Sequence, residues 1–188
     1  MNIPRCALGV AVSGNYLYAL GGHYRDYYYG SGYQDSVERS AINADGSLGP
    51  WQGAGTMTTP RAFFATVAVG GYLYAIGGTS SDGIWLNTIE RAAINADGSL
   101  GPWQVISMMT SPRSHHAAVA VNGYLYILGG WNGSSVLDSV ERASTARHKS
   151  FGSLGRQRTT GICPLERFGH CLVEVGDELQ NTLPQVIH

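Results

Sequence analysis

An internal repeat of roughly 50 residues constrains this chain more than any other feature. The string INADGSLGPWQ occurs at Ile42–Gln52 and again, unchanged, at Ile94–Gln104. A glycine pair recurs in phase with it, each time after an apolar run that contains tyrosine, at Gly21-Gly22, Gly77-Gly78 and Gly129-Gly130. Pro-Arg and Glu-Arg pairs recur in the same phase. A period of this length is typical of solenoids, propellers and arrays, so the chain consists of copies of one supersecondary unit.

Each unit has the pattern of four short β-strands. In the second unit the runs Phe64–Val69 and Tyr72–Ile76 flank a Gly-Gly turn, which predicts a hairpin. A third strand is expected over Leu86–Ile94, and the turn Asp97-Gly98 leads into a fourth strand around Trp103. The second strand is apolar on both faces, so it must be covered on both sides.

The distribution of side-chain size favours blades that are packed around an axis over a flat sandwich. Ala65–Val69 and Ala117–Val121 alternate alanine with valine or threonine, which suits strands crowded around an axis. Trp51 and Trp103 are expected on the fourth strand, where blades splay apart. The sequence therefore predicts an all-β fold, a partial and open β-propeller of about three four-stranded blades plus part of a fourth.

The unit resembles the kelch repeat, with an opening Arg, an apolar hairpin that ends in Gly-Gly, a Val-Glu-Arg strand and a Trp. The resemblance covers residues 4–143. The tyrosine usual after Val-Glu-Arg is replaced by Ser40, Ala92 and Ala143, which indicates a divergent subgroup whose partners cannot be transferred. The expected divisions are repeat 1 over 4–59, repeat 2 over 60–111, repeat 3 with a decayed outer strand over 112–166, and a degenerate partial repeat 4 over 167–188.

The fourth unit has lost its packing residues. Arg167 and His170 still match Arg113 and His116, but the positions of the tyrosine run and of the Gly-Gly pair now hold Glu-Leu-Gln and Leu-Pro. A closed propeller needs at least about four blades. We therefore expect a truncated, open arc, a fragment of a larger propeller, that self-associates through exposed blade faces, aggregates or is completed by another chain.

Composition and charge exclude several classes of function. The chain has 12 basic and 13 acidic residues and a net charge of −1, which argues against nucleic acid as a partner. The N-terminal residues do not form a signal peptide, so the cytoplasm is the default compartment for this chain, although longer relatives could be exported. No apolar run approaches the roughly 18 residues of a membrane span, so no membrane association is expected.

The chain carries no known catalytic motif, neither G-x-S-x-G, G-x-x-x-x-G-K, H-E-x-x-H nor C-x-x-C. If His115 and His116 lie on a strand, they point to opposite faces and cannot share a metal ion. Phe64 stands at the position of His116 in the second unit, which favours packing. The Asn- and Asp-rich segments at Asp45 and Asp97 are interpreted as hairpin turns rather than calcium loops. We therefore expect a protein that is not an enzyme, with no catalytic residue, metal site or cofactor.

Features that differ between the units are the candidates for function. Between the second and third strands lie three unequal loops, His23–Asp35, Thr79–Asn87 and Trp131–Leu137, and the first is the longest and richest in tyrosine. Because strands alternate in direction, these loops share one face with the connections between units. The hypothesis is a binding scaffold that recognises protein or carbohydrate through an aromatic and Arg-rich face, formed by Tyr24, Arg25, Tyr27, Tyr28, Tyr29, Tyr33, Arg61, Trp85, Arg113 and Trp131.

Three alternatives stay open. Some propellers that resemble kelch repeats are enzymes acting on sugars, of the sugar-acid isomerase or copper oxidase type, but that likeness is one of fold alone. The chain could also be a remnant without a function of its own. Finally, the tyrosine-rich loop could be a surface loop that binds nothing.

Overall fold

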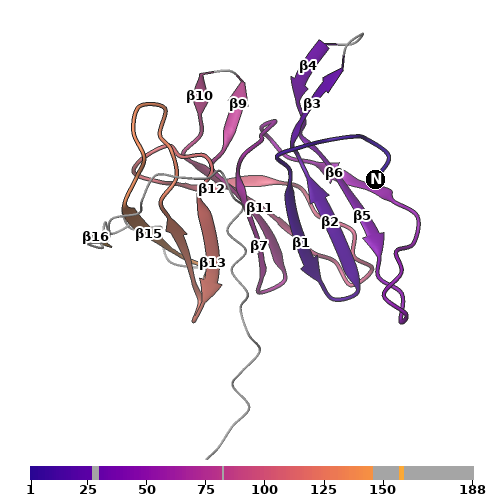
Figure 1. The fold of residues 1–188 in the computed structure, drawn as a ribbon. Helices are drawn as coiled ribbons and strands as arrows, with labels where there is room; N and C mark the ends of the chain where they lie inside the picture. Colours follow the sequence, from indigo (N-terminus) through magenta and orange to yellow (C-terminus); the bar gives the residue numbers. More distant parts are fainter. Residues whose placement is uncertain (27–29, 82, 146–156, 159–188) are drawn as a thin grey trace, which may run out of the picture.

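The structure, a computed structural model, describes residues 1–26, 30–81, 83–145 and 157–158. These residues form strands and turns, and none of them belongs to a helix that is long and apolar enough to cross a membrane. Three antiparallel four-stranded sheets follow one another along the chain (Figure 1). The sheets do not close into a ring, so the predicted all-β, partial and open propeller is confirmed. The partial fourth repeat, 167–188, lies outside the described residues.

Every blade has the same meander from an inner to an outer strand. Blade 1 consists of β1 (Gly9–Ser13), β2 (Tyr16–Leu20), β5 (Ser36–Ala41) and β6 (Gln52–Thr56). Blade 2 consists of β7 (Ala65–Val69), β8 (Tyr72–Ile76), β11 (Thr88–Ala93) and β12 (Gln104–Met108). Blade 3 consists of β13 (Ala117–Val121), β14 (Tyr124–Leu128), β15 (Ser139–Ser144) and the short β16 (Gln157–Arg158). Two further hairpins join β3 (His23–Asp26) to β4 (Gly30–Tyr33), and β9 (Thr79–Ser81) to β10 (Ile84–Trp85).

The inner hairpin of blade 2 forms as the sequence predicts. Val69 pairs with Tyr72 across Gly70-Gly71, whose φ angles are +60° and +76°. A two-residue turn with positive φ at both positions matches the right-handed twist of its strands, and glycine adopts it without steric cost. One expectation was wrong in detail, because Trp103 precedes β12 instead of lying on the outer strand.

Two apolar layers hold the three blades together. Between blades 1 and 2, Tyr18 and Leu20 pack with Leu73, and Trp103 closes the layer at 6% exposure. Between blades 2 and 3, Tyr74, Ile76 and Ile89 pack with Leu125 and Ile127, all less than 2% exposed. Each such aliphatic side chain contributes about 1.5–3 kcal/mol. The second strand of blade 2 is thus covered on both faces, as its apolar pattern requires.

Backbone hydrogen bonds also cross the boundaries between blades, and the same three occur at both. The Phe63 N–H donates to the carbonyl of Ala7, and the His115 N–H donates to that of Phe63, each at 2.9 Å. Ala7, Phe63 and His115 have φ between +50° and +55°, which is uncommon for residues with a side chain. The other two bonds run from Gly22 to Arg61 and from Arg61 to Gln34 at the first boundary, and from Gly78 to Arg113 and from Arg113 to Leu86 at the second.

Gly77 lies where blade 2 and blade 3 approach each other closely. A Cβ atom at Gly77 would lie 2.6 Å from the Arg113 carbonyl oxygen and 2.9 Å from His116 Cε1. We expect Gly77→Ala to cost about 2–4 kcal/mol, since strain at φ +58° adds to the clash. Gly70→Ala is the matched control, because Gly70 has φ +60° but no atom within 4 Å of its Cβ position. Urea unfolding of both variants isolates the clash, and equal losses of stability would contradict it.

Candidate functional site

One face of the arc carries the connections from the second to the third strand of each blade, and we call it the loop face (Figure 1). In each blade the first residue of this connection pairs with the segment that enters the innermost strand. The pairs are Cys6 with His23, Ala62 with Thr79, and Ser114 with Trp131. The loops and the connections between blades therefore share one face, as the alternation of strand direction predicted.

The tyrosine-rich loop of blade 1 is a hairpin that rises from the loop face. β3 and β4 pair Tyr24 with Gly32 and His23 with Tyr33. The Tyr24 ring lies over Gly32, where an added Cβ would be only 3.0 Å from it. The rings of His23 and Tyr33 meet edge to face at 5.1 Å. For Arg25 the structure describes the backbone alone, and Tyr27, Tyr28 and Tyr29 lie outside the described residues.

The loops of blades 2 and 3 extend this aromatic surface. The Trp85 ring on β10 lies over Gly133 of blade 3, where an added Cβ would be 2.8 Å from Trp85 Cε3. Its neighbour Ile84 is 52% exposed, and Trp131 is 37% exposed. β4 of blade 1 contacts β9 of blade 2. The loop face is therefore continuous across the three blades.

Arg61 and Arg113 do not belong to this surface, which corrects the expectation from the sequence. Both are fully buried inside their blades, where Arg61 pairs with Glu90 and Arg113 with Glu141. The Arg61 Nη1 also donates to the carbonyl oxygen of Gly77 at 2.8 Å. Burial lowers the pKa of Arg61, while Glu90 opposes the shift. Neither guanidinium is accessible to a ligand, so these two arginines add nothing to the aromatic surface.

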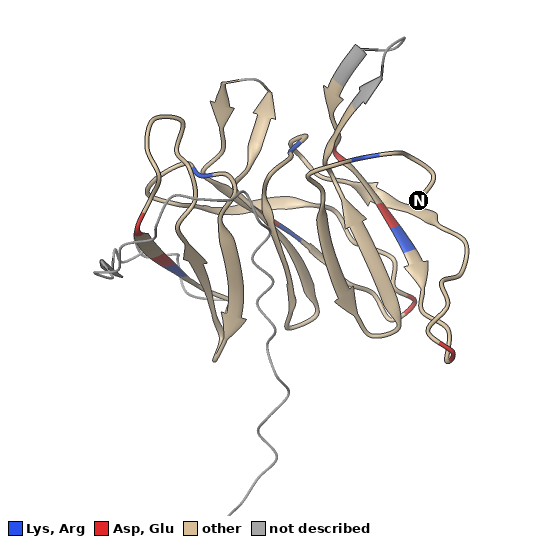
Figure 2. Cartoon of the chain, in the orientation of Figure 1, with Lys and Arg blue, Asp and Glu red and all other residues tan. Residues whose placement is uncertain are grey.

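The recurring Glu-Arg pairs serve the blades themselves. Each glutamate accepts the buried arginine, and the arginine that follows it stacks on a tyrosine of the second strand. The guanidinium carbons of Arg39, Arg91 and Arg142 lie 5.0, 4.4 and 4.9 Å from the ring centres of Tyr16, Tyr72 and Tyr124. Figure 2 shows acidic and basic residues adjacent on β5. These interactions support the structural role inferred from the repetition.

One aromatic pair near the axis was not predicted from the sequence. Phe63 and His115 stack with ring centres 4.4 Å apart, on neighbouring blades, and both are exposed. Partial desolvation of the exposed imidazole, which stacks on Phe63, lowers the pKa of His115. His115 also has φ +53° and precedes β13, so the argument from strand alternation does not apply to it. The sequence signal for this pair was that units 2 and 3 have an aromatic ring, Phe63 and His115, where the first unit has Ala7.

His116 packs in the core, as the comparison with Phe64 predicted. It is 9% exposed, and neither of its ring nitrogens has a hydrogen-bond partner within the described residues. Desolvation, aided by the positive charge of Arg113, lowers its pKa to about 3. Within the same residues no three His, Cys, Asp or Glu side chains are grouped so that they could hold a metal ion.

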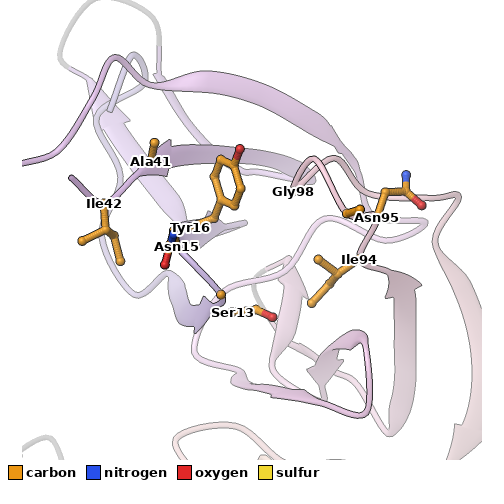
Figure 3. A pocket seen from close by; sticks show the side chains of 10 residues that line it. Ser13, Asn15, Tyr16, Ala41, Ile42, Ile94, Asn95 and Gly98 are labelled. Atoms are coloured by element: carbon orange, nitrogen blue, oxygen red, sulfur yellow. The ribbon is translucent and has the colours of Figure 1, made fainter. Parts of the chain in front are cut away.

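A depression of about 610 Å³ opens between blades 1 and 2, on the face of the arc opposite to the loop face (Figure 3). Ser13, Asn15 and Tyr16 line it from blade 1, and Ile94 and Asn95 from blade 2. Its lining holds no carboxylate, imidazole, amine or thiol. These side chains offer hydrogen bonds and apolar contact but no acid or base for chemistry.

The adjacent polar turns are closed by their own side chains. Asp45 Oδ1 accepts the backbone N–H of Ser47 at 2.9 Å and its hydroxyl at 2.6 Å, and Asp97 accepts Ser99 with the same two distances. These hydrogen bonds lower the pKa of both carboxyls. The interpretation of these segments as turns is confirmed.

Comparison with protein families now bears on the repeat. A model described as the Kelch motif matches residues 60–91 and 112–142, from the opening Pro-Arg to the Glu-Arg pair of blades 2 and 3. The chain is a kelch-repeat protein. The buried Arg–Glu pairs and the Gly-Gly pairs therefore have a structural role in this kelch repeat.

Curated relatives carry the same repeat. The kelch chain is 29% identical to Kelch-like protein 33 of Homo sapiens over 66% of its own length and 21% of that protein. It is 32% identical to Kelch-like protein 26 of Mus musculus, over 68% of this chain and 20% of the relative. It is 28% identical to Kelch repeat and BTB domain-containing protein 1 of Ectromelia virus, over 74% of this chain and 23% of the relative. The chain thus spans about a fifth of the length of these relatives.

Proposed function

We propose that this chain is a non-enzymatic scaffold that binds a protein partner through the aromatic surface of its loop face. The observation that carries the proposal is the gathering of Tyr24, Tyr33, Trp85 and Trp131 on one face, on loops that differ between repeats. Aromatic side chains of this kind dominate binding hot spots. The arginines and glutamates of the repeat are engaged inside the blades, which leaves the loops as the variable, accessible part. Membership of a family with Kelch-like relatives supports a protein-binding role.

Carbohydrate is the alternative ligand, because flat aromatic rings also suit the apolar faces of sugars. Arrays that contain both classes decide between the two. For the sugar isomerase or oxidase alternative, no acid, base or metal-ligand arrangement in the described residues gives support.

The double substitution Tyr24→Ala with Trp85→Ala tests the loop face. We expect a loss of at least about 2 kcal/mol of binding free energy, roughly a 30-fold weaker Kd, because hot-spot aromatics carry most of an interface's energy. The measurement is protein and glycan array screening of the wild type, followed by titration of each hit with both proteins. Leu48→Ala is the control, since Leu48 is exposed but lies in the outer turn away from the loop face. Equal affinities for wild type and the double variant, with unchanged circular dichroism, would place recognition elsewhere.

A further inference from the structure

The two end blades of the arc present different apolar faces. On blade 1, Val10 and Val12 of the inner strand are 54% and 55% exposed. On blade 3, Val121, Tyr124 and Leu128 are 47%, 38% and 40% exposed. Scattered single apolar residues on a surface are normal, but each of these sets is clustered on the inner strands of one side of its sheet.

The repeat shows what each face is built to contact. The blade 2 residues equivalent to Val121, Tyr124 and Leu128 are Val69, Tyr72 and Ile76, and all three pack in the layer against blade 3. The equivalents of Val12 are Ala68, which packs in the layer against blade 1, and Ala120, which packs in the layer against blade 2. The open face of blade 3 therefore corresponds to the face with which blades 1 and 2 each contact the next blade. The open face of blade 1 corresponds to the face with which blades 2 and 3 each contact the preceding blade.

The backbone groups at the two ends match in the same way. At both existing boundaries the second glycine of the Gly-Gly pair donates to the carbonyl of the next blade's Arg, and a residue at positive φ donates to its counterpart in the preceding blade. The corresponding groups at the ends are the Gly130 N–H and the His115 carbonyl of blade 3, and the Arg5 carbonyl and the Ala7 N–H of blade 1. Together they would form the same two bonds between blade 3 and a following blade 1.

The methionine that precedes each blade completes the match. Met57 and Met109 are 3% and 2% exposed, and the methyl group of each contacts the first glycine of the preceding blade's Gly-Gly pair. Met1 occupies the equivalent position, since Asn2, like Thr58, donates its backbone N–H at 2.8 Å to the glutamate of the blade. Met1 is, however, 50% exposed, and Gly129 has no methionine against it.

From this complementarity we infer that two copies of the chain associate head to tail, with the open face of blade 3 of each copy bound to the open face of blade 1 of the other. In such a pair the two contacts are related by a two-fold axis, and each joins a blade 3 face to a blade 1 face, so the assembly closes on itself. The three described blades of each copy would make a ring of six, within the range of about four to eight blades in propellers. This inference does not depend on the loop face, because the loops lie outside the open faces of blades 1 and 3.

Sedimentation equilibrium and native mass spectrometry of the 188-residue chain test the inference. We expect a species of twice the 20.1 kDa chain mass. Val12→Glu and Leu128→Glu place a charge in one half of the boundary each, so each variant alone should dissociate at least tenfold more readily. Val105→Glu is the control, because Val105 is 46% exposed but lies on the outer strand of the central blade. Circular dichroism establishes that each variant is folded.

Mixing the two variants gives the sharpest test. The Val12→Glu chain keeps an intact blade 3 face and the Leu128→Glu chain an intact blade 1 face, so their mixture should form a one-to-one dimer that neither forms alone. A monomeric wild type would overturn the inference and show that the chain's own segments cover blade 3. A dimer insensitive to Val12→Glu would also overturn it, since the blade 1 face would then lie outside the contact. Polydisperse larger species would exclude the closed ring.

Discussion

Replacing Glu90 by alanine is expected to destabilise the protein by about 3–5 kcal/mol, because it leaves the Arg61 guanidinium buried without its counter-charge. Arg61 and Glu90 are both fully buried, and they form an ion pair at the centre of the arc. Glu90 also accepts the backbone N–H of Thr58 at 2.8 Å, so the substitution removes the partner of a second group. The measurement is the free energy of unfolding from urea titration of the wild type and the variant.

Blade 1 provides the matched control for this prediction. Glu38 occupies the same place and pairs with Arg5 at 3.1 Å, and the Arg5 side chain is also shielded from solvent, but this pair lies in an end blade that has a described neighbouring blade on one side alone. Glu38→Ala should therefore cost less than Glu90→Ala. Equal costs would mean that burial between two blades does not set the energetic importance of the pair.

The second large effect is a dependence of stability on pH that arises from His116. Its pKa is about 3 in the folded protein, against about 6.5 in an unfolded chain. Above pH 6.5 both states are neutral at this residue, and it adds no pH dependence. As the pH falls from 6.5 toward 3, the unfolded state binds a proton that the folded state does not, so stability is lost by about 1.4 kcal/mol for each pH unit.

Substitution by the residue of the sister repeat isolates this effect. Phe64 stands at the same position in blade 2 and is 8% exposed, so His116→Phe is expected to fold. The difference in unfolding free energy between His116→Phe and the wild type should grow by about 2 kcal/mol between pH 6.5 and pH 4.5. Carboxylates and the neighbouring His115 titrate in both proteins and cancel. Parallel curves for the two proteins over this range would show that His116 is not held neutral.

The fold could be predicted from the sequence because the same local pattern of turns and apolar runs occurs in three repeats. The Gly-Gly turns, the two-sided apolar runs and the alternation of small residues each follow from backbone geometry or from the burial of a strand. The placement of the aromatic loops and the blade connections on one face also followed, since strand direction alternates. The start of the outer strand was predicted less well, because Trp103 packs between blades from the position just before β12.

The candidate site was only partly predictable. The sequence identified the loop of Tyr24 and Tyr33 as the feature that differs most between repeats. It could not show that Arg61 and Arg113 turn inward, because a buried Arg is distinguished from an exposed one only by a carboxylate on a distant strand. It could not show the stacking of Phe63 on His115 either, since that pair depends on a left-handed backbone conformation at both residues.

What the sequence alone determined is therefore the blade: its strands, its turns and its two apolar faces, all of which follow from contacts within one repeat. What the tertiary structure decided is the relation between blades and the location of charge. Backbone bonds such as that from His115 to Phe63 join residues 52 positions apart, and no local pattern encodes them. The same holds for the pKa of His116, because desolvation by the facing blade sets it.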